Sequence, residues 1–319
     1  MNANQMKAIA IQQFGSVDEL QLRSLPIPVP NHNEVLVRVM ASGINPVDVL
    51  LREGFAAGSN PQFPLVMGVD LSGVVVSVGS SVSEFKSGDA VYAHKQGGNG
   101  TYAEYAVLPV QWVAHKPKTL EHTQAAAVPC VALTAYQVLT EVLQLKAGET
   151  ILITGGLGGV GSMAVQIAVD IGAEVIATAS KRNHSFLKEL GVSEVIDYNT
   201  TDFVEAVFSH HPNGVDAVFT TVGGDTKYRS IKAVKDKGRL VWISSEEPAG
   251  PNSERNIQTT MFYARADAKS LDKITALIDS GKLKPFIEDV LTLERAKEAQ
   301  QRVASGRVRG KLVLEITHS

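Results

Sequence analysis

The sequence predicts an α/β protein in which a compact β-barrel-like region precedes a parallel, doubly wound sheet. In the first part of the chain, short runs that suit β-strands, such as 35–40 and 73–78, are separated by Pro and Gly. From about residue 124, apolar strand-like runs alternate with helical segments. This alternation is typical of a parallel sheet with helices packed on its faces.

Each part of the chain contains further elements of its own type. In the first part, strands are also expected over 88–92 and over 101–107, which follows a Gly- and Asn-rich loop. In the second part we expect helices over 125–143, 160–171, 185–190 and 203–209, and strands over 150–154, 175–179, 195–196, 217–221 and 240–244. We interpret 257–263 as the last strand of the sheet, 270–280 as an amphipathic helix, and 310–316 as a strand that returns to the first domain.

Composition excludes several classes of protein. The chain has 319 residues and a net charge of −3, with no long block of like charge, which argues against a nucleic-acid-binding surface over the whole protein. No apolar run reaches the roughly 18 residues that a membrane span needs, and the first residues are too polar for a signal peptide. The one cysteine, Cys130, excludes an intrachain disulfide and a four-cysteine zinc site. We therefore expect a cytoplasmic protein that does not bind membranes.

The glycine-rich stretch ILITGGLGGVGS, residues 151–162, is the strongest motif in the chain. Gly156, Gly158 and Gly161 fit the G-x-G-x-x-G pattern between a buried strand and a helix. Glycine suits a turn with positive φ, and it lets a pyrophosphate come close to backbone N–H groups. The helix start then supplies oriented N–H donors and a partial positive charge. The motif predicts that this domain binds a dinucleotide.

The residues after the next strand indicate which dinucleotide it is. NAD-specific folds usually have an acidic residue at the tip of that strand, which binds the ribose 2′-hydroxyl. Here the tip reads Ser180, Lys181, Arg182 and Asn183, without a carboxylate. Lysine and arginine pair with a 2′-phosphate, and basic residues at a helix start oppose the helix dipole unless an anion lies nearby. The alternative is a solvated basic helix start, and the motif favours NADPH over NADH.

Several segments together resemble the medium-chain dehydrogenase/reductase superfamily, in particular its zinc-free quinone oxidoreductase and enone reductase branch. The matching segments are 41–48, 68–73, 128–136, 158–161, 178–183, 195–198 and 309–313. The resemblance covers the full length. It implies a GroES-like catalytic domain formed by 1–123 and 266–319, and a Rossmann NADPH-binding domain over 124–265.

The resemblance also implies which residues bind the cofactor. Ser180, Lys181, Arg182 and Tyr198 would surround the 2′-phosphate, although Tyr198 also suits a surface aromatic at a strand end. Asn45 and Thr134 would lie near the nicotinamide. The remaining cofactor contacts would come from Gly159, Val160, Gly161, Ile243, Gly310 and Lys311.

The same resemblance leads us to expect no metal. Zinc alcohol dehydrogenases of this superfamily have Cys where Asn45 stands and His-Glu where Val69 and Asp70 stand. Their third ligand aligns with Cys130, and one ligand of three cannot hold catalytic zinc. We interpret Cys130 as a small buried residue.

Without zinc, the expected chemistry is hydride transfer to an acceptor that is already electron-poor. A quinone or the β-carbon of an α,β-unsaturated carbonyl fits this requirement. No tyrosine stands at Leu50 or Ala56, where related quinone reductases have one. The candidate catalytic polar groups are Asn45, Asp48, Tyr92 and His94. Asp48 and Asp70 equally suit carboxylates that order the loops of the site.

Two further questions stay open from the sequence. The alternative to a reductase is a non-catalytic NADPH-binding protein that acts as a redox sensor, a structural protein or an RNA binder. Phe262 and Tyr263 suit either the wall of a substrate site or a subunit interface. We expect a homodimer formed through the uncharged strand 257–263, because an open sheet edge is seldom left unprotected. The alternative is that 270–280 covers this edge within one chain.

Overall fold

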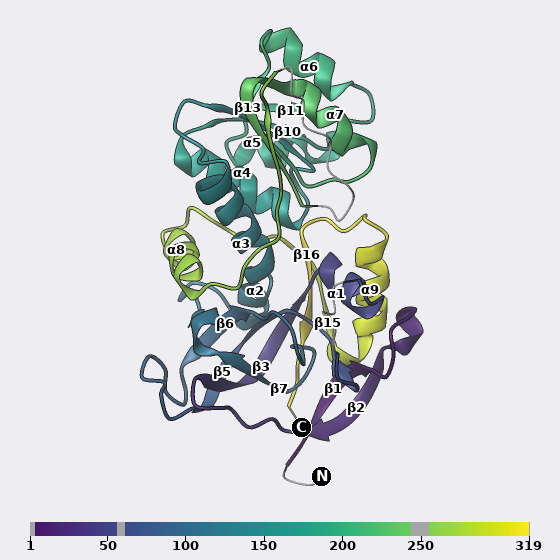
Figure 1. Cartoon of the computed structure of the whole chain (residues 1–319), viewed down its shortest axis with the longest axis vertical. Helices are drawn as coiled ribbons and strands as arrows, with labels where there is room; N and C mark the ends of the chain where they lie inside the picture. Colours follow the sequence, from purple (N-terminus) through teal and green to yellow (C-terminus); the bar gives the residue numbers. More distant parts are fainter. Residues whose placement is uncertain (1–3, 56–60, 244–254, 319) are drawn as a thin grey trace. The chain divides into compact units, whose positions relative to one another are not determined.

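The computed structural model describes residues 4–55, 61–243 and 255–318 (Figure 1). The chain forms two compact units. The first unit comprises Met1–Leu133, Arg265–Gly281 and Pro285–Ser319, and the second comprises Thr134–Ala264 and Lys282–Lys284.

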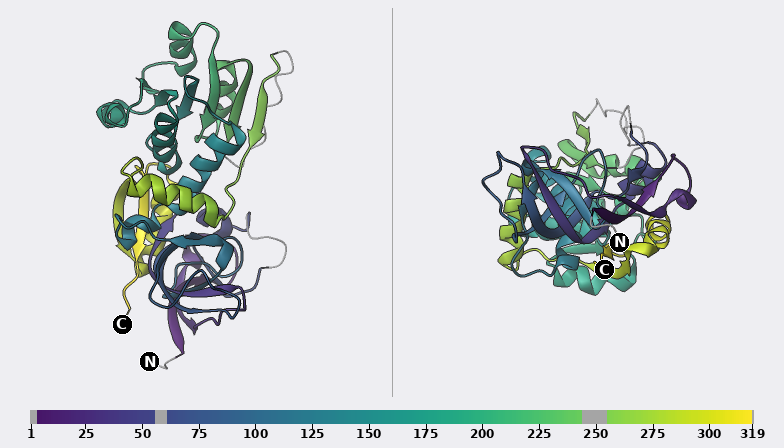
Figure 2. Two further views of the ribbon diagram at one scale, coloured as in Figure 1. Left: turned by 90° about the vertical axis from the view of Figure 1, so that its left-hand side faces the viewer. Right: turned by 90° about the horizontal axis from the view of Figure 1, so that it is seen from below.

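The first unit is built on two sheets whose strands curve around its core (Figure 2). The larger sheet has the order β15-β16-β3-β5-β6-β8, and β7 pairs with β3. Its strands are β3 (Glu34–Ile44), β5 (Asp70–Val78), β6 (Ala90–His94), β7 (Tyr105–Pro109), β8 (Val113–His115), β15 (Ile287–Thr292) and β16 (Lys311–Glu315). The smaller sheet joins β2 (Gln21–Pro26), β1 (Gln5–Ile11) and β4 (Leu65–Val66).

These strands confirm most of the predictions for the first unit. The predicted strand over 310–316 is β16, which pairs antiparallel with β3 and so returns the chain end to the first unit. The predicted strand over 101–107 is wrong in its first half. There Tyr102 and Glu104 exchange backbone hydrogen bonds with β1, through an isolated bridge at Ala103. The regular strand β7 begins only at Tyr105.

The helices of the first unit lie at the ends and sides of its sheets. They are α1 (Pro46–Arg52), α2 (His122–Ala126), α8 (Ala268–Asp279) and α9 (Ala296–Ala304). The predicted amphipathic helix over 270–280 is confirmed as α8, which buries Leu271, Ile274 and Ile278 and packs against β8. Helix α8 therefore belongs to the first unit.

The single helix predicted over 125–143 is wrong, because the segment forms three pieces. Helix α2 ends at Ala126, and α3 (Pro129–Gln137) starts a new helix. Proline has no N–H to donate, so it suits the first position of a helix and not its interior. A π-helical turn over Val138–Val142 follows.

The second unit is a six-stranded parallel sheet in the order β11-β10-β9-β12-β13-β14. The strands are β9 (Thr150–Thr154), β10 (Glu174–Thr178), β11 (Glu194–Ile196), β12 (Val215–Thr220), β13 (Val234–Trp242) and β14 (Gln258–Met261). Helices α4 (Gly159–Ile171) and α5 (His184–Glu189) lie on one side of the sheet, and α6 (Phe203–His210) and α7 (Asp225–Ala233) on the other (Figure 1).

The doubly wound parallel sheet confirms the fold predicted from the alternating pattern. The strand predicted over 240–244 begins earlier, since β13 covers Val234–Trp242, and residue 244 lies outside the described residues. The order reverses at β9, so the segments after β9 and β12 emerge side by side at the carboxyl edge. Ligands of such sheets bind at this switch point. Helix α7 was not predicted because most of its residues are polar, and it buries only Lys227, Ser230 and Ala233.

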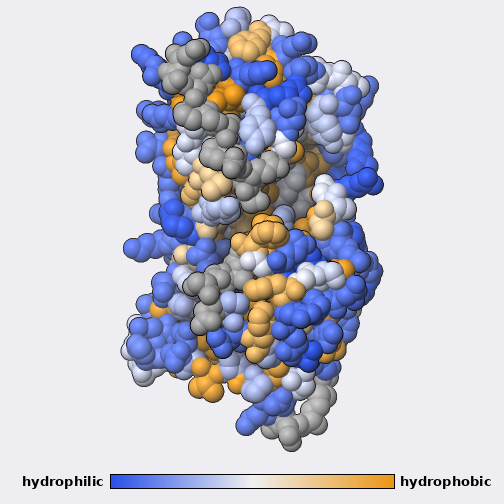
Figure 3. Space-filling view, turned by 45° about the vertical axis from the view of Figure 1, so that its right-hand side comes forward, coloured by the Kyte–Doolittle hydropathy of each residue, from blue (hydrophilic) through white to orange (hydrophobic). Residues whose placement is uncertain are grey.

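Each unit has its own apolar core. That of the first unit includes Ile11, Val37 and Leu312, and that of the second includes Leu152, Val218 and Trp242. On the face shown in Figure 3, apolar side chains occur in small groups among hydrophilic ones. No helix within the described ranges is both long and apolar enough to cross a membrane.

Candidate functional site

The structure divides the candidate residues into two sets, one in each unit. The glycine motif, the basic tip, Thr134, Tyr198 and Ile243 belong to the second unit. Asn45, Asp48, Tyr92, His94, Gly310 and Lys311 belong to the first.

The glycine loop of the second unit joins the fully buried strand β9 to helix α4. The positive φ that we expected within the motif occurs at Gly155, where φ is 68°, one residue before the motif begins. Gly158, by contrast, has a φ of −70° that any residue adopts. The loop is fixed from β10, because Thr178 accepts hydrogen bonds from the backbone N–H groups of Gly155 (3.0 Å) and Gly156 (3.0 Å).

The glycines of the motif serve different purposes. A Cβ at Gly161 would overlap the carbonyl oxygen of Gly155, and one at Gly156 would lie 2.9 Å from the Cβ of Ala177. These two glycines allow the loop, the helix and β10 to pack closely. At Gly158 the nearest atom to an added Cβ is 3.5 Å away, so protein packing does not require glycine there.

Helix α4 begins without a capping side chain, since its N-cap residue is Gly158. The first N–H groups of an α-helix have no partner inside the helix. Here these groups belong to Gly159, Val160 and Gly161, which are therefore suited to bind a pyrophosphate together with the helix dipole.

The basic tip follows β10 as a single turn of 3-10 helix, Lys181–Asn183, with Ser180 as its N-cap. Lys181 and Arg182 are exposed. Neither has an ion-pair partner within the ranges that the structure describes. Asn183 is buried, and its amide Nδ2 donates to Ser180 Oγ at 3.1 Å. Two unpaired cations next to a hydroxyl form a site that an anion can occupy.

The other cofactor candidates of the second unit lie on separate elements. Tyr198 follows β11 and is 57% exposed, so its ring is available to a ligand. Thr134 is buried on α3, and Ile243 directly follows β13.

In the first unit, a hydrogen-bonded cluster joins Asn45, Asp48, Asp70, His94, Tyr102 and Lys311, which we call the buried polar cluster. All six residues are buried. Asn45 lies between the two charged members, Asp70 and Lys311. Its Nδ2 donates to Asp70 Oδ2 at 2.9 Å, and its Oδ1 accepts from Lys311 Nζ at 2.5 Å. The orientation of its amide is therefore fixed.

Lys311 was expected among the cofactor contacts, and the structure places it in this cluster. Its ammonium also donates to the carbonyl oxygen of Ile44 at 2.6 Å and lies 3.9 Å from Asp70 Oδ2. Gly310, which precedes β16, has a φ of 76°.

Asp70, on β5, is the centre of the cluster. Its Oδ1 accepts from His94 Nδ1 at 2.9 Å and from the backbone N–H of Cys130 at 3.0 Å. His94 is on β6, directly opposite Asp70 in the register of the two strands. A carboxylate bound to Nδ1 fixes the orientation of the imidazole.

Asp48 and Tyr102 form the other end of the cluster. Asp48 Oδ2 accepts from the Tyr102 hydroxyl at 2.7 Å and from the Asn45 N–H at 2.7 Å, which caps α1. Asp48 Oδ1 has no hydrogen-bond partner among the described residues. Burial raises the pKa of Asp48 to about 7, partly opposed by the hydrogen bond from Tyr102. Asp48 can therefore gain or lose a proton near neutral pH.

Tyr92, another of the candidate polar groups, lies apart from this cluster, and its hydroxyl already has partners. The side chain is fully buried, and its hydroxyl bonds the Leu271 carbonyl and the Thr275 hydroxyl of α8, each at 2.8 Å. Burial raises the pKa of the Tyr92 hydroxyl well above its usual value. Tyr92 therefore anchors α8 and is not part of the buried polar cluster.

Three potential metal donors meet in the first unit. The donor atoms of Asp70, His94 and Cys130 lie within 4.8 Å of one another. However, both Asp70 oxygens already accept hydrogen bonds, and the Lys311 ammonium lies 3.9 Å from one of them. A dication would be repelled by this ammonium, so the arrangement fits a hydrogen-bonded network better than a zinc site.

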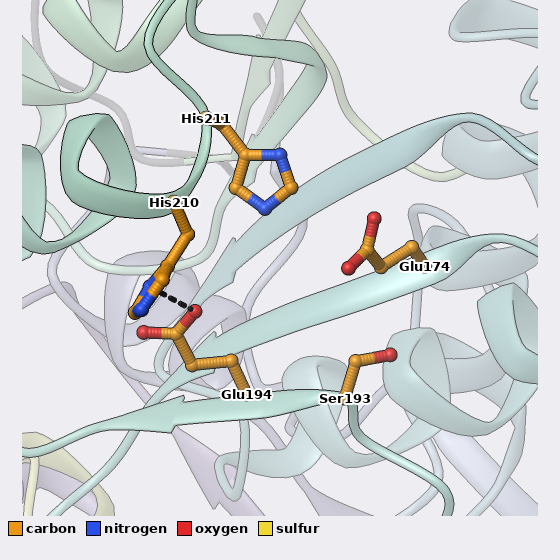
Figure 4. A pocket seen from close by; sticks show the side chains of 5 residues that line it. All are labelled: Glu174, Ser193, Glu194, His210 and His211. Atoms are coloured by element: carbon orange, nitrogen blue, oxygen red, sulfur yellow. Dashed lines mark ion pairs between the residues drawn. The ribbon is translucent and has the colours of Figure 1, made fainter.

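A pocket of the second unit is lined by Glu174, Ser193, Glu194, His210 and His211 (Figure 4). Glu174 and Glu194 begin strands β10 and β11, so this pocket lies at the opposite edge of the sheet from the glycine loop. His210 Nδ1 lies 3.2 Å from Glu194 Oε2, and such partly exposed pairs contribute little. This pocket is therefore not the nucleotide site.

Sequence reasoning missed Tyr102 and the central position of Asp70. Tyr102 lies 54 residues from its partner Asp48, and no local pattern connects them. Asp70 was recognised only as a carboxylate that could order a loop.

Comparisons with known proteins agree with this architecture. Residues 31–118 match the family model described as alcohol dehydrogenase GroES-like domain, and residues 190–314 match that of zinc-binding dehydrogenase. The chain is 34% identical to 2-methylene-furan-3-one reductase of Solanum lycopersicum, over 98% of this chain and 79% of that protein. It is 31% identical to human NAD(P)H oxidoreductase RTN4IP1, mitochondrial, over 98% and 89% of the two chains.

The solved structures include a quinone oxidoreductase from Coxiella burnetii that is 33% identical. It superposes with a TM-score of 0.87, covering 98% of this chain and 100% of that one. Similarity of this extent to both sequences and structures shows the family as well as the fold. The chain therefore belongs to the medium-chain dehydrogenase/reductase superfamily of NAD(P)H oxidoreductases, among its quinone oxidoreductases and enone reductases.

Proposed function

We propose that the protein transfers a hydride from NADPH to a quinone, or to the β-carbon of an α,β-unsaturated carbonyl, without zinc. The observation that carries the proposal is the carboxyl edge of the parallel sheet in the second unit. The glycine loop and the basic tip lie at this edge, which we call the nucleotide edge. There the uncapped start of α4 suits a pyrophosphate, and the exposed Lys181 and Arg182 suit a 2′-phosphate. A carboxylate at the tip, which would favour NADH, is absent from the sequence Ser180 to Asn183.

The acceptor class follows from the hydrogen bonding of the buried polar cluster. Since Asp70 already accepts hydrogen bonds from His94, Asn45 and the Cys130 N–H, and the Lys311 ammonium lies nearby, we expect no Lewis acid there to polarise a simple carbonyl. Quinones and enones need less activation, because conjugation spreads the negative charge that the hydride delivers. The names of two similar proteins, quinone oxidoreductase and 2-methylene-furan-3-one reductase, point to the same acceptors.

In this proposal the buried polar cluster supplies the side chain that hydrogen-bonds the oxygen of the acceptor. His94 is oriented by Asp70 and can donate a hydrogen bond or a proton to the acceptor oxygen. Asn45 is held rigidly by Lys311 and Asp70, so it is suited to position the nicotinamide. Asp48 holds an exchangeable proton next to Asn45.

A turnover assay tests the proposal. NADPH oxidation is followed with 9,10-phenanthrenequinone and with a panel of enones, before and after prolonged dialysis against EDTA. We expect turnover with at least one acceptor, unchanged by EDTA, and well under one zinc per chain by elemental analysis. The alternative, a non-catalytic NADPH-binding protein, predicts nucleotide binding without turnover. Stoichiometric zinc that is lost together with activity would contradict the zinc-free chemistry.

We also propose a homodimer joined through β14. This strand is the outermost of its sheet, and the N–H of Phe262 donates inward to the Trp242 carbonyl. Strand residues alternate in direction, so the backbone groups of Thr259 and Met261 point outward, where a second copy could pair with them. Met261 is 42% exposed.

Light scattering at micromolar concentration tests this assembly. The wild-type mass should be near twice 34.1 kDa. Thr259→Lys with Met261→Pro should lower it toward the monomer, because neither change removes an inward hydrogen bond of β14. A wild type that remains monomeric at high concentration would refute the assembly.

The cellular location is proposed from cysteine content. A single cysteine suits a reducing compartment, and we propose the cytoplasm. The human relative is named as mitochondrial, so cell fractionation with an antibody to the untagged protein is the appropriate test.

A further inference from the structure

Cys130 lies where a thiol can react. It is the second residue of the nine-residue helix α3, and it is partly exposed. A helix start carries a partial positive charge that favours a thiolate over a thiol. It is also the only cysteine of the chain, so no second thiol of the same chain can form a disulfide with it.

A base and an orienting carboxylate accompany the thiol. Asp70 Oδ1 binds both His94 Nδ1, at 2.9 Å, and the backbone N–H of Cys130, at 3.0 Å. The donor atoms of the three side chains lie within 4.8 Å of one another, although the residues come from β5, β6 and α3. A nucleophile, an imidazole and a carboxylate that orients the imidazole are the parts of an activated cysteine.

The other charged groups of the cluster favour the same chemistry. The Lys311 ammonium lies 3.9 Å from Asp70 Oδ2, so it partly balances the charge of that carboxylate. Asp48 is separated from Asp70 by Asn45, which hydrogen-bonds both. Of the charged groups in the cluster, Asp70 is the one whose hydrogen bond to the imidazole the described residues show.

We propose that Cys130 is a covalent modification site for α,β-unsaturated carbonyls, with His94 as the base and Asp70 as the residue that positions it. In this proposal the thiol proton passes to Nε2, the ring nitrogen of His94 that does not bind Asp70. The sulfur electron pair then forms a C–S bond to the β-carbon, and the C=C π electrons shift to the enolate. The imidazolium returns its proton to the α-carbon, so that the net reaction is the addition of a thiol without oxidation or reduction.

The choice of an α,β-unsaturated carbonyl as the electrophile rests on the proposed function. No other part of the inference depends on that function. A β-carbon that accepts a hydride also accepts a thiolate. Thr134, which is expected near the nicotinamide, lies four residues further along α3 and so one turn from Cys130. We therefore propose an enone as the electrophile that reacts with this thiol.

Alkylation without NADPH tests the inference. The full chain is incubated with but-3-en-2-one at pH 7, and the intact mass is followed with time, with peptide mapping of the product. We expect a single adduct at Cys130, formed at least about tenfold faster than on glutathione under the same conditions, because an imidazole takes the proton. The Cys130→Ser variant should gain no fast adduct, which identifies the residue.

Two comparisons separate activation from mere exposure. His94→Gln keeps a donor for Asp70 but no base, so its rate should fall by about tenfold or more. The wild type in urea should react no faster than glutathione, and this comparison holds even if the His94 variant does not fold. A folded-state rate at or below that of glutathione, or an unchanged rate in a folded His94→Gln variant, would overturn the inference. Since this experiment contains no NADPH, its outcome is independent of the separate turnover assay, and alkylation here together with no turnover there would refute the proposed function and leave this inference standing.

Discussion

The nucleotide edge of the second unit and the buried polar cluster of the first unit are built in opposite ways. The edge comes from one stretch of chain, in which β9, the glycine loop, α4, β10 and the basic tip follow one another. The cluster gathers residues from distant positions, and the Lys311–Asn45 hydrogen bond joins residues 266 positions apart. A site made by consecutive residues can be recognised in a sequence, whereas one made by tertiary contacts cannot.

The two regions also differ in how their charges are satisfied. Lys181 and Arg182 are exposed cations without an ion-pair partner among the described residues, so they are available to a ligand. In the cluster, Asp70, Lys311 and Asn45 already satisfy one another. Changes at the edge should therefore act on nucleotide binding, and changes in the cluster on stability and on protonation.

The largest effect is expected at the glycines of the nucleotide edge, where substitution of Gly161 and of Gly158 should have different consequences for stability. Gly161→Ala should destabilise the free protein by about 3 kcal/mol or more and abolish NADPH binding, because its Cβ would overlap the Gly155 carbonyl. Gly158→Ala is the matched control, since its Cβ fits. We expect it to melt like the wild type without nucleotide and to bind NADPH at least about tenfold more weakly, because the pyrophosphate approaches its backbone.

Thermal melting without ligand and NADPH fluorescence titration provide these two readings. If both variants lose stability equally, the loop glycines serve packing alone. If Gly158→Ala binds NADPH normally, the pyrophosphate does not approach that residue.

The next largest effect concerns protonation of the cluster. Burial raises the pKa of Asp48 to about 7, above its value in the unfolded chain. The folded state therefore holds the proton more tightly, so this stabilising contribution is full below pH 4 and is lost as the pH rises through 7. Between pH 5 and pH 7 the loss should be about 2 kcal/mol.

Urea unfolding of the wild type and of Asp48→Asn at pH 5, 6 and 7 measures this loss. The variant has no proton to lose at this position, so its stability should decrease less over the range. Parallel curves for the two proteins would mean that Asp48 is ionised throughout.

A smaller effect is expected at the basic tip. Replacing both Lys181 and Arg182 with Ala should raise the KM for NADPH about tenfold or more and leave the KM for NADH nearly unchanged. Each charged hydrogen bond to a phosphate is worth roughly 1.5–3 kcal/mol. Steady-state kinetics with both cofactors measure the change, and Lys188→Ala on α5 is a control for general loss of positive charge. A wild type that already prefers NADH would contradict the role of the tip.

The sequence predicted the elements whose pattern is local. The strands over 150–154 and 175–179 and the start of α4 after the glycines were correct, because buried strands and a glycine turn leave a signal in consecutive residues. The prediction failed where another part of the chain decides the outcome. Residues 102–104 pair with β1 instead of extending β7, and α2 and α3 are separated at Pro129.

The candidate catalytic groups show the same division. Asn45, Asp48 and His94 were selected from their residue types, and the structure brings them together with Asp70, Tyr102 and Lys311. Tyr92, only two residues from His94, binds α8 instead. Residue type alone did not distinguish these two outcomes, because burial and partners depend on elements far away in the sequence.

Transfer of deuterium from the cofactor tests the central claim most directly. EDTA-dialysed protein is incubated with but-3-en-2-one and NADPH that carries deuterium at C4 on the transferred face, and the ketone product is analysed by mass spectrometry and NMR. Hydride transfer to an enone predicts butan-2-one with one deuterium at the former β-carbon. Two results would contradict the account. One is consumption of NADPH without deuterium at the former β-carbon of the product, and the other is no turnover with this or any other electron-poor acceptor.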